Sequence, residues 1–177
     1  MSNKLTIAIS GKSGCGNTSV SGIVADRLNL RLINFTFHNL ADELGIPFNE
    51  LLQRAHQDPQ YDLSLDRRQK ELASAGNCVL GSRLAIWLLP CAELKVYLTA
   101  SPECRAKRIA QREKRPWEEV MRETVVRDRN DHERFLKLYG IDNDRYDFVD
   151  LIINTEEGNQ FYVAEKIIEF VRKRFKG

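Results

Sequence analysis

The sequence predicts an α/β fold in which a five-stranded parallel sheet is flanked by helices. Short apolar runs typical of strands alternate along the chain with longer segments of helical periodicity. This alternation is typical of parallel sheets with right-handed crossovers. The first apolar run ends in a glycine-rich turn that leads into a helix. Because such sheets bind ligands at the carboxyl ends of their strands, this turn marks the expected site.

The elements can be placed by their apolar runs and by the residues that typically begin and end helices. The expected strands span residues 5–9, 30–35, 77–80, 94–99 and 148–154. The expected helices span residues 20–28, 37–44, 47–57, 61–75, 101–113, 116–139 and 161–175. Ser101 and Pro102 form a typical helix start, and Gly76 and Gly140 follow helix ends. At this length the chain is expected to form one domain, residues 1–177.

Composition and charge exclude several classes of protein. The chain has 27 Lys and Arg residues against 25 Asp and Glu, so bulk charge implies no nucleic-acid partner. The N-terminus is too short for a secretion signal, and the longest apolar stretch, residues 84–89, is too short for a membrane span. Cys15, Cys78, Cys91 and Cys104 form no metal-binding pattern. We therefore expect free thiols, no zinc site, no membrane partner and a cytoplasmic location.

The segment GKSGCGNTS, residues 11–19, is the predicted phosphate-binding loop. Glycines let backbone N–H groups point at an anion, and the dipole of the following helix favours negative charge there. The segment fits the pattern G-x-x-x-x-G-K-[ST] at Gly11, Gly16 and Thr18, but Asn17 stands where lysine is expected. The Thr18 hydroxyl can still bind Mg²⁺ and phosphate. The alternative interpretation is a glycine-rich turn without a ligand.

Charged side chains at helical spacing form two groups in the second half of the chain. They are Arg105, Arg108 and Arg112 in one expected helix, and Arg127, Asp131 and Arg134 in the next. Phosphoryl transfer needs fixed positive charge, and planar guanidinium groups suit phosphates and pyrimidine edges. Together with the glycine-rich loop, these groups favour a phosphoryl-transfer site. The alternative is two solvent-exposed faces with ordinary ion pairs.

Several stretches together resemble the cytidylate kinases of the compact archaeal type, a branch of the P-loop nucleoside monophosphate kinases. They are ISGKSGCGNTSV, DRRQKELASAGNCVL with SRLAIW, RAKRIAQRE, and ERFLKLYGID followed by YDFVDLIINT. The resemblance covers nearly the whole chain and implies the P-loop kinase fold. It also implies two mobile insertions, which are nucleoside monophosphate-binding helices at 36–75 and a lid with its flanking helices at 105–134.

The resemblance implies that a monomer transfers the ATP γ-phosphoryl group to CMP, and also to dCMP, with Mg²⁺ as cofactor. ATP is expected to bind at Gly11, Lys12, Ser13, Gly14, Cys15, Gly16, Asn17, Thr18 and Ser19. The implied catalytic residues are Arg108, Arg112 and Thr18, of which Thr18 also binds the metal. CMP is expected to bind at His38, Arg83, Arg127, Asp131 and Arg134.

The sequence departs from the family's pattern at three places. The branch usually carries threonine where Asn17 stands, so this departure is of a tolerated kind. His38 replaces an arginine that clamps the phosphate of the acceptor, and Gly81 replaces an acidic residue that helps to hold Mg²⁺. Two alternatives therefore stay open. One is a kinase for a different small acceptor on the same scaffold, and the other is a nucleotide-binding protein without useful turnover.

Overall fold

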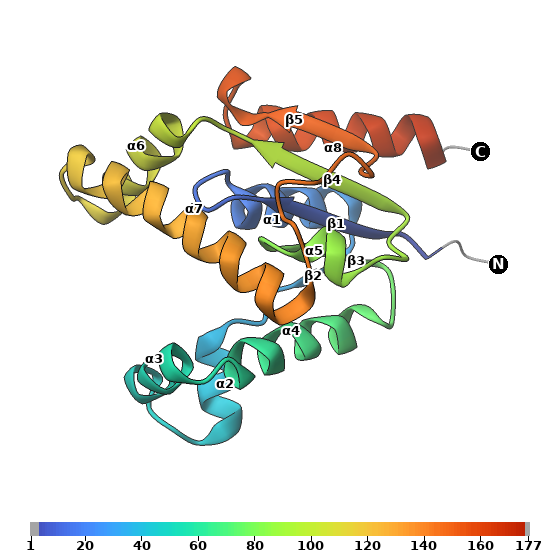
Figure 1. Cartoon of the computed structure of the whole chain (residues 1–177). Coiled ribbons are helices and arrows are strands. Elements are labelled where there is room, and N and C mark those ends of the chain that lie inside the picture. Colours follow the sequence, from blue (N-terminus) through green and yellow to red (C-terminus); the bar gives the residue numbers. More distant parts are fainter. Residues whose placement is uncertain (1–3, 176–177) are drawn as a thin grey trace.

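The computed structural model describes residues 4–175, which form one parallel sheet with helices on both faces (Figure 1). The strands are β1 (Thr6–Gly11), β2 (Arg31–Ile33), β3 (Cys78–Gly81), β4 (Leu94–Thr99) and β5 (Leu151–Asn154). The helices are α1 (Asn17–Leu28), α2 (Phe37–Leu44), α3 (Phe48–Gln57), α4 (Gln60–Ala73), α5 (Ala85–Leu88), α6 (Pro102–Glu113), α7 (Trp117–Tyr139) and α8 (Gln160–Phe175). A 3₁₀ turn, η1 (Thr155–Glu157), joins β5 to α8.

The strand order is β2-β3-β1-β4-β5, and every neighbouring pair is parallel. This confirms the predicted five-stranded parallel sheet. Ile9 of β1 pairs with Gly81 of β3, and Gly11 pairs with Leu98 of β4. The carboxyl ends of these three central strands therefore meet at one edge of the sheet. The connections that follow β1 and β3 both start there, which is where α/β sheets bind their ligands.

Apolar side chains cover both faces of the sheet. On one face, Val24 of α1 and Ile167 of α8 pack against Ile7 of β1. On the other, Ile86 of α5 packs near Leu80 of β3. The central strands are buried on both faces, which explains why most of their residues are apolar. Burying each such side chain contributes about 1.5–3 kcal/mol.

Two groups of helices stand outside the sheet layers, each with its own apolar cluster (Figure 1). Helices α2, α3 and α4 enclose Leu40 and Leu51. Helices α6 and α7 pack through Ile109 and Val120. These groups coincide with the expected nucleoside monophosphate-binding helices and the expected lid. Their mobility stays a prediction.

Three of the differences from the sequence-based prediction concern β5, β2 and α5. The last strand begins at Leu151 instead of residue 148, because Phe148 lies in a turn, with its ring edge-on to Trp87 at 5.9 Å between centroids. Strand β2 covers only Arg31–Ile33, since Phe35 turns away from the sheet to pack among α2–α4. The apolar stretch 84–89 forms the short helix α5, which the sequence analysis did not assign.

The structure also describes the four cysteines and the character of each helix. All four cysteines are free thiols. Burial raises the pKa of the Cys15 thiol to about 11, so this thiol stays protonated and packs as an apolar group. No helix within residues 4–175 combines the length and apolar character that a membrane span requires.

Candidate active site

The glycine-rich loop between β1 and α1 lines a cavity of about 690 Å³. Helix α1 begins at Asn17, so the positive end of its dipole lies at this cavity. Other segments complete the wall, and they contribute Gly81, Ser82, Arg83, Arg108, Ile109, Arg112, Thr155, Gly158, Asn159, Gln160, Phe161 and Val163. The cavity thus combines backbone N–H groups at a helix start with arginines from two other segments. This combination is suited to binding the phosphates of a nucleotide.

Gly14 lies where the loop packs against α6. Its φ angle is +87°, a conformation that favours glycine. A Cβ atom at this position would lie only 2.9 Å from the Cβ atom of Arg105. The loop therefore needs glycine here both for its backbone conformation and for its close contact with α6.

Replacing Gly14 with alanine is expected to weaken ATP binding by at least about 10-fold, because the loop must shift to relieve both strains. Isothermal titration of ATP measures the effect. Gly22→Ala is the matched control, because a Cβ at Gly22, in the middle of α1, meets no described atom within 4 Å. Alanine there is expected to stabilise the helix by about 0.5–1 kcal/mol and to leave ATP binding unchanged. Equal ATP affinities for the two variants would contradict this account of the loop.

Asn17 closes the loop instead of presenting a cation to a ligand. Its Nδ2 atom donates a hydrogen bond of 2.6 Å to the carbonyl oxygen of Gly11, at the other end of the loop. Its Oδ1 atom is buried and finds no hydrogen-bond donor within residues 4–175. The residue in the lysine position of the motif therefore has a structural role that a neutral amide can fill.

The close packing around Gly81 explains why no acidic residue stands at the end of β3. A Cβ atom there would lie 2.0 Å from Oγ of Ser21 and 2.7 Å from the carbonyl oxygen of Asn17. Helix α1 thus packs directly on the backbone of β3 at this point. The acidic side chain that the resemblance implies at this position cannot fit against this helix.

Arg105 is buried and connects three parts of the site. Only 2% of its side chain is exposed, and its guanidinium forms a bidentate ion pair with Asp128 of α7, at 3.0 and 2.6 Å. It also donates to the carbonyl oxygen of Ser13 in the loop, at 3.1 Å. Arg105 therefore fixes α6 and α7 relative to the loop. The interpretation of its helix face as solvent-exposed is wrong for this residue.

Arg108 and Arg112 both line the large cavity, but they differ in their contacts. Arg108 donates to Oγ1 and to the carbonyl oxygen of Thr155, at 2.8 and 2.7 Å, and to the carbonyl oxygen of Gly14 at 3.3 Å. Arg112 is 67% exposed and pairs, among the described residues, only with Glu113 at 3.4 Å. Arg112 is thus free to turn toward a ligand, whereas Arg108 also braces η1 against α6.

The residues expected to bind CMP fall into three places. Asp131 of α7 pairs with Arg83 at 2.5 Å and with Arg134 at 3.4 Å, so these three side chains come together. Arg127 instead donates to Oγ of Ser13 at 3.2 Å and so lies at the loop. His38 is exposed and stacks on Phe48, with ring centroids 3.6 Å apart. The role of His38 in binding CMP stays a prediction.

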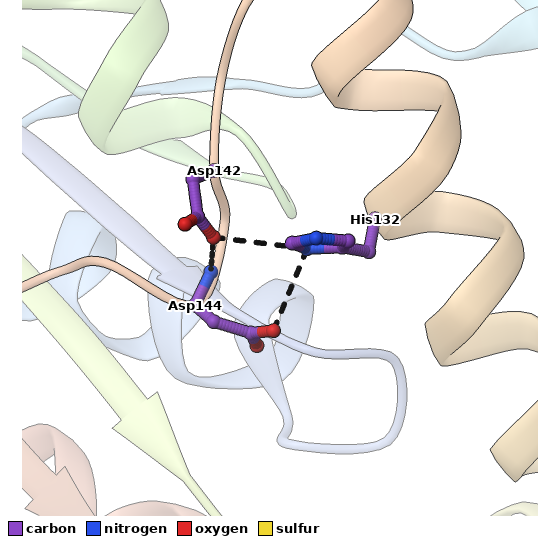
Figure 2. A group of neighbouring side chains, drawn as sticks. All are labelled: His132, Asp142 and Asp144. Atoms are coloured by element: carbon purple, nitrogen blue, oxygen red, sulfur yellow. Dashed lines mark hydrogen bonds and ion pairs between the residues drawn. The ribbon is translucent and has the colours of Figure 1, made fainter.

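Lys12 points away from the large cavity and forms an ion pair of 2.7 Å with Asp144. Figure 2 shows how Asp142 and Asp144 converge on the ring of His132 in α7. The distances from Nδ1 of His132 are 3.7 and 3.4 Å. The three side chains are of metal-ligating type, but the Lys12 ammonium already compensates the charge of Asp144. The group therefore serves here to hold the segment after α7 against the loop.

A second, smaller cavity of about 80 Å³ lies between α4 and α7. Ser82 and Arg83 line it as they line the large one. The sequence analysis missed the polar residues that α4 presents there, which are Asp62, Asp66 and Gln69. Their spacing of four and three residues was the available signal, because it places all three on one helix face.

The large cavity offers hydroxyl groups, and no carboxylate, to a divalent metal ion. Thr18 and Ser19 are exposed there, and none of the described residues that line it is acidic. A magnesium ion that arrives with a nucleotide keeps several waters and takes few ligands from the protein. One hydroxyl beside the phosphates therefore fits such an ion.

Comparison with solved structures defines the class of protein. A shikimate kinase from Acinetobacter baumannii superposes with a TM-score of 0.66 over 97% of this chain and 94% of its own, at 19% identity. A shikimate kinase from Bacteroides thetaiotaomicron gives a TM-score of 0.64 over 98% of this chain and 99% of its own, at 15% identity. At these identities the likeness concerns the fold alone. The chain therefore shares the fold of these kinases, and it carries the glycine-rich loop between β1 and α1.

Comparison of sequences defines the family. The profile of the cytidylate kinase-like family matches residues 6–157. Cytidylate kinase 2 of Borreliella burgdorferi is 44% identical over 174 residues, which cover 96% of this chain and 97% of that protein. Cytidylate kinase of Archaeoglobus fulgidus is 38% identical over 172 residues, which cover 96% and 93%. The chain belongs to the cytidylate kinase-like family.

Proposed function

We propose that the chain transfers the γ-phosphoryl group of Mg²⁺-bound ATP to CMP, and also to dCMP, giving ADP and the cytidine diphosphate. One observation carries the proposal, together with the relatives named cytidylate kinase. Ser82 and Arg83 line both the large cavity at the glycine-rich loop and the small cavity between α4 and α7. A donor in the first and an acceptor in the second would therefore bring their phosphates together at Arg83.

The reaction is a direct in-line transfer. An oxygen of the CMP phosphate attacks the γ-phosphorus, a new P–O bond forms, and the bond to the β,γ-bridging oxygen of ATP breaks as ADP leaves. The protein mostly positions the reactants and neutralises charge. Thr18 would hold the metal ion that accompanies ATP, and the ion would neutralise charge on the ATP phosphates.

Each part of the site has a task in this reaction. The loop amides hold the ATP phosphates, and Arg108 and Arg112 stabilise the charge that develops on the transferred group. Arg83 and Arg134 bind the phosphate or the base of the acceptor. Asp131 holds these two arginines and acts as a positioning residue. A monomer is the proposed active form.

Asp131→Ala is expected to raise KM for CMP by at least about 10-fold, because it leaves Arg83 and Arg134 without their shared carboxylate. It is also expected to weaken the choice among CMP, UMP and AMP. Initial rates with the three acceptors measure both effects. Glu133→Ala, at an exposed position two residues further along α7, is the control. If Asp131→Ala leaves the choice among the acceptors unchanged, pyrimidine recognition is assigned to the wrong group.

Asn17, His38 and Gly81 support one second candidate function, that of a nucleotide-binding protein without useful turnover. The two functions are separated by titrating the protein with ATP and CMP and then analysing the products by anion-exchange chromatography. The kinase is expected to bind both nucleotides and to form CDP and ADP in equal amounts. Tight binding of both without CDP would favour the second candidate.

A further inference from the structure

Two residues that line the small cavity between α4 and α7 each carry a buried polar atom without a hydrogen-bond partner among the described residues. One is the acceptor Oε1 of Gln69, and the other is the donor Nε of Arg134. Neither finds a hydrogen-bond partner within residues 4–175. Apolar side chains of Phe37, Leu65 and Leu138 line the same cavity. Unpaired buried polar groups are rare in folded proteins, so an unpaired acceptor and an unpaired donor on two residues that line one cavity point to a polar ligand there.

The amide of Gln69 is fixed in one orientation. Its side chain is buried, with 8% exposed, and its Nε2 atom donates to the carbonyl oxygen of Phe35 at 2.9 Å. Rotating the amide by 180° would place Oε1 against that carbonyl oxygen, and two acceptors would then face each other. Gln69 can therefore offer the cavity only an acceptor.

Asp66 adds a second acceptor on the same face of α4, three residues before Gln69. Its Oδ2 atom accepts a hydrogen bond from the hydroxyl of Tyr139. Burial raises the pKa of the Asp66 carboxyl from its ordinary value, and nearby Asp62 acts in the same direction, whereas the bond from Tyr139 lowers it. A half-buried carboxyl with a raised pKa, held by a tyrosine beside a cavity, is typical of a functional position.

We propose that Gln69 and Asp66 recognise the exocyclic amino group of cytosine, while Arg134 donates to the ring acceptors N3 or O2. The proposal rests on CMP being the acceptor of the reaction, and it names the side chains that select the base. The amino group of cytosine carries two N–H donors, which match the two acceptors on α4. Its N3 and O2 atoms accept hydrogen bonds and match the open donor of Arg134.

The same arrangement rejects uracil. Uracil carries an oxygen in place of the amino group, so it would set an acceptor against the acceptors of Gln69 and Asp66. Its N3 atom is a donor and would face the donor of Arg134. The mismatch leaves several buried polar groups unpaired, and sites of this kind discriminate by large factors. We therefore expect CMP to be preferred strongly over UMP.

The sharpest test is Asp66→Asn. Asparagine can still accept the hydrogen bond from Tyr139, and its NH₂ group then faces the cavity and can donate to the O4 atom of uracil. We expect the ratio of kcat/KM for CMP to that for UMP to fall by at least about 10-fold, mainly through KM. Gln69→Leu, which removes the second acceptor, is expected to lower the same ratio. Glu71→Gln is the matched control, because Glu71 lies on α4 but is exposed and pairs with Arg68.

A second measurement needs no variant and so does not depend on the variants folding. The 5′-monophosphate of pyrimidin-2-one riboside has the cytosine ring without its amino group. The wild-type chain is expected to use it with kcat/KM at least about 10-fold below that for CMP. If CMP is phosphorylated, but this analogue equals CMP and Asp66→Asn keeps the CMP preference, the assignment of the base-reading residues is wrong while the kinase function stands. Failure of the wild type to use CMP would overturn the proposed function, and this inference with it.

Discussion

Replacing Arg105 with alanine is expected to lower the free energy of unfolding by about 3–5 kcal/mol, which is a large share of the stability of a typical domain. The guanidinium is buried, pairs with Asp128 through two hydrogen bonds and also holds the loop at Ser13. Without it, the Asp128 carboxylate has no cationic partner within residues 4–175. Urea denaturation followed by circular dichroism measures the loss.

Two further variants make this test specific. Lys107→Ala changes an exposed cation on the same helix and is expected to change stability by less than about 0.5 kcal/mol. Arg105→Ala combined with Asp128→Ala is expected to cost less than the sum of the two single changes, because each single change already breaks the same pair. Additive losses would show that Arg105 stabilises the fold through its other contacts.

Replacing Arg112 with alanine is expected to lower kcat by about 10³-fold and to leave stability nearly unchanged. Arg112 lines the large cavity, is mostly exposed and pairs within residues 4–175 only with Glu113, so little of the fold depends on it. In the proposed reaction its charge acts on the phosphoryl group during transfer. Initial rates with saturating CMP and ATP measure kcat, and thermal unfolding measures stability.

Two other arginine variants serve as comparisons for Arg112→Ala. Arg172→Ala, an exposed position on α8 outside the cavity lining, is the control and is expected to keep full activity. Arg108→Ala is expected to lower both kcat and stability, because Arg108 also holds Thr155. A loss of less than about 10-fold in kcat for Arg112→Ala would exclude it from the transfer step.

Much of the fold follows from local signals in the sequence. Proline and glycine mark the observed start of α6 and the end of α7, and the apolar runs locate all five strands. The misplaced start of β5 has a physical cause. Phe148 and Val149 are apolar and resemble the start of a strand, but Phe148 packs on Trp87 from a turn. Apolar character alone cannot distinguish a residue in a strand from one that packs from a turn.

The site was less accessible to sequence reasoning than the fold. The loop could be predicted because its glycines and hydroxyl residues lie together in the chain. The role of Arg105 could not, because helical spacing places it beside Arg108 without revealing that Asp128 and the loop would bury it. Likewise, the unpaired atoms of Gln69 and Arg134 are properties of the packed structure, since they depend on which neighbours fail to reach them.

The most direct test of the account measures ADP production in a coupled assay. The wild-type chain is supplied with ATP and Mg²⁺ and with each of CMP, dCMP, UMP, AMP and GMP in turn. The account predicts rapid turnover with CMP or dCMP and little with the other acceptors, which would also show that Asn17 is compatible with phosphoryl transfer. No turnover with any acceptor, from protein that still binds ATP, would contradict it and favour the non-catalytic function.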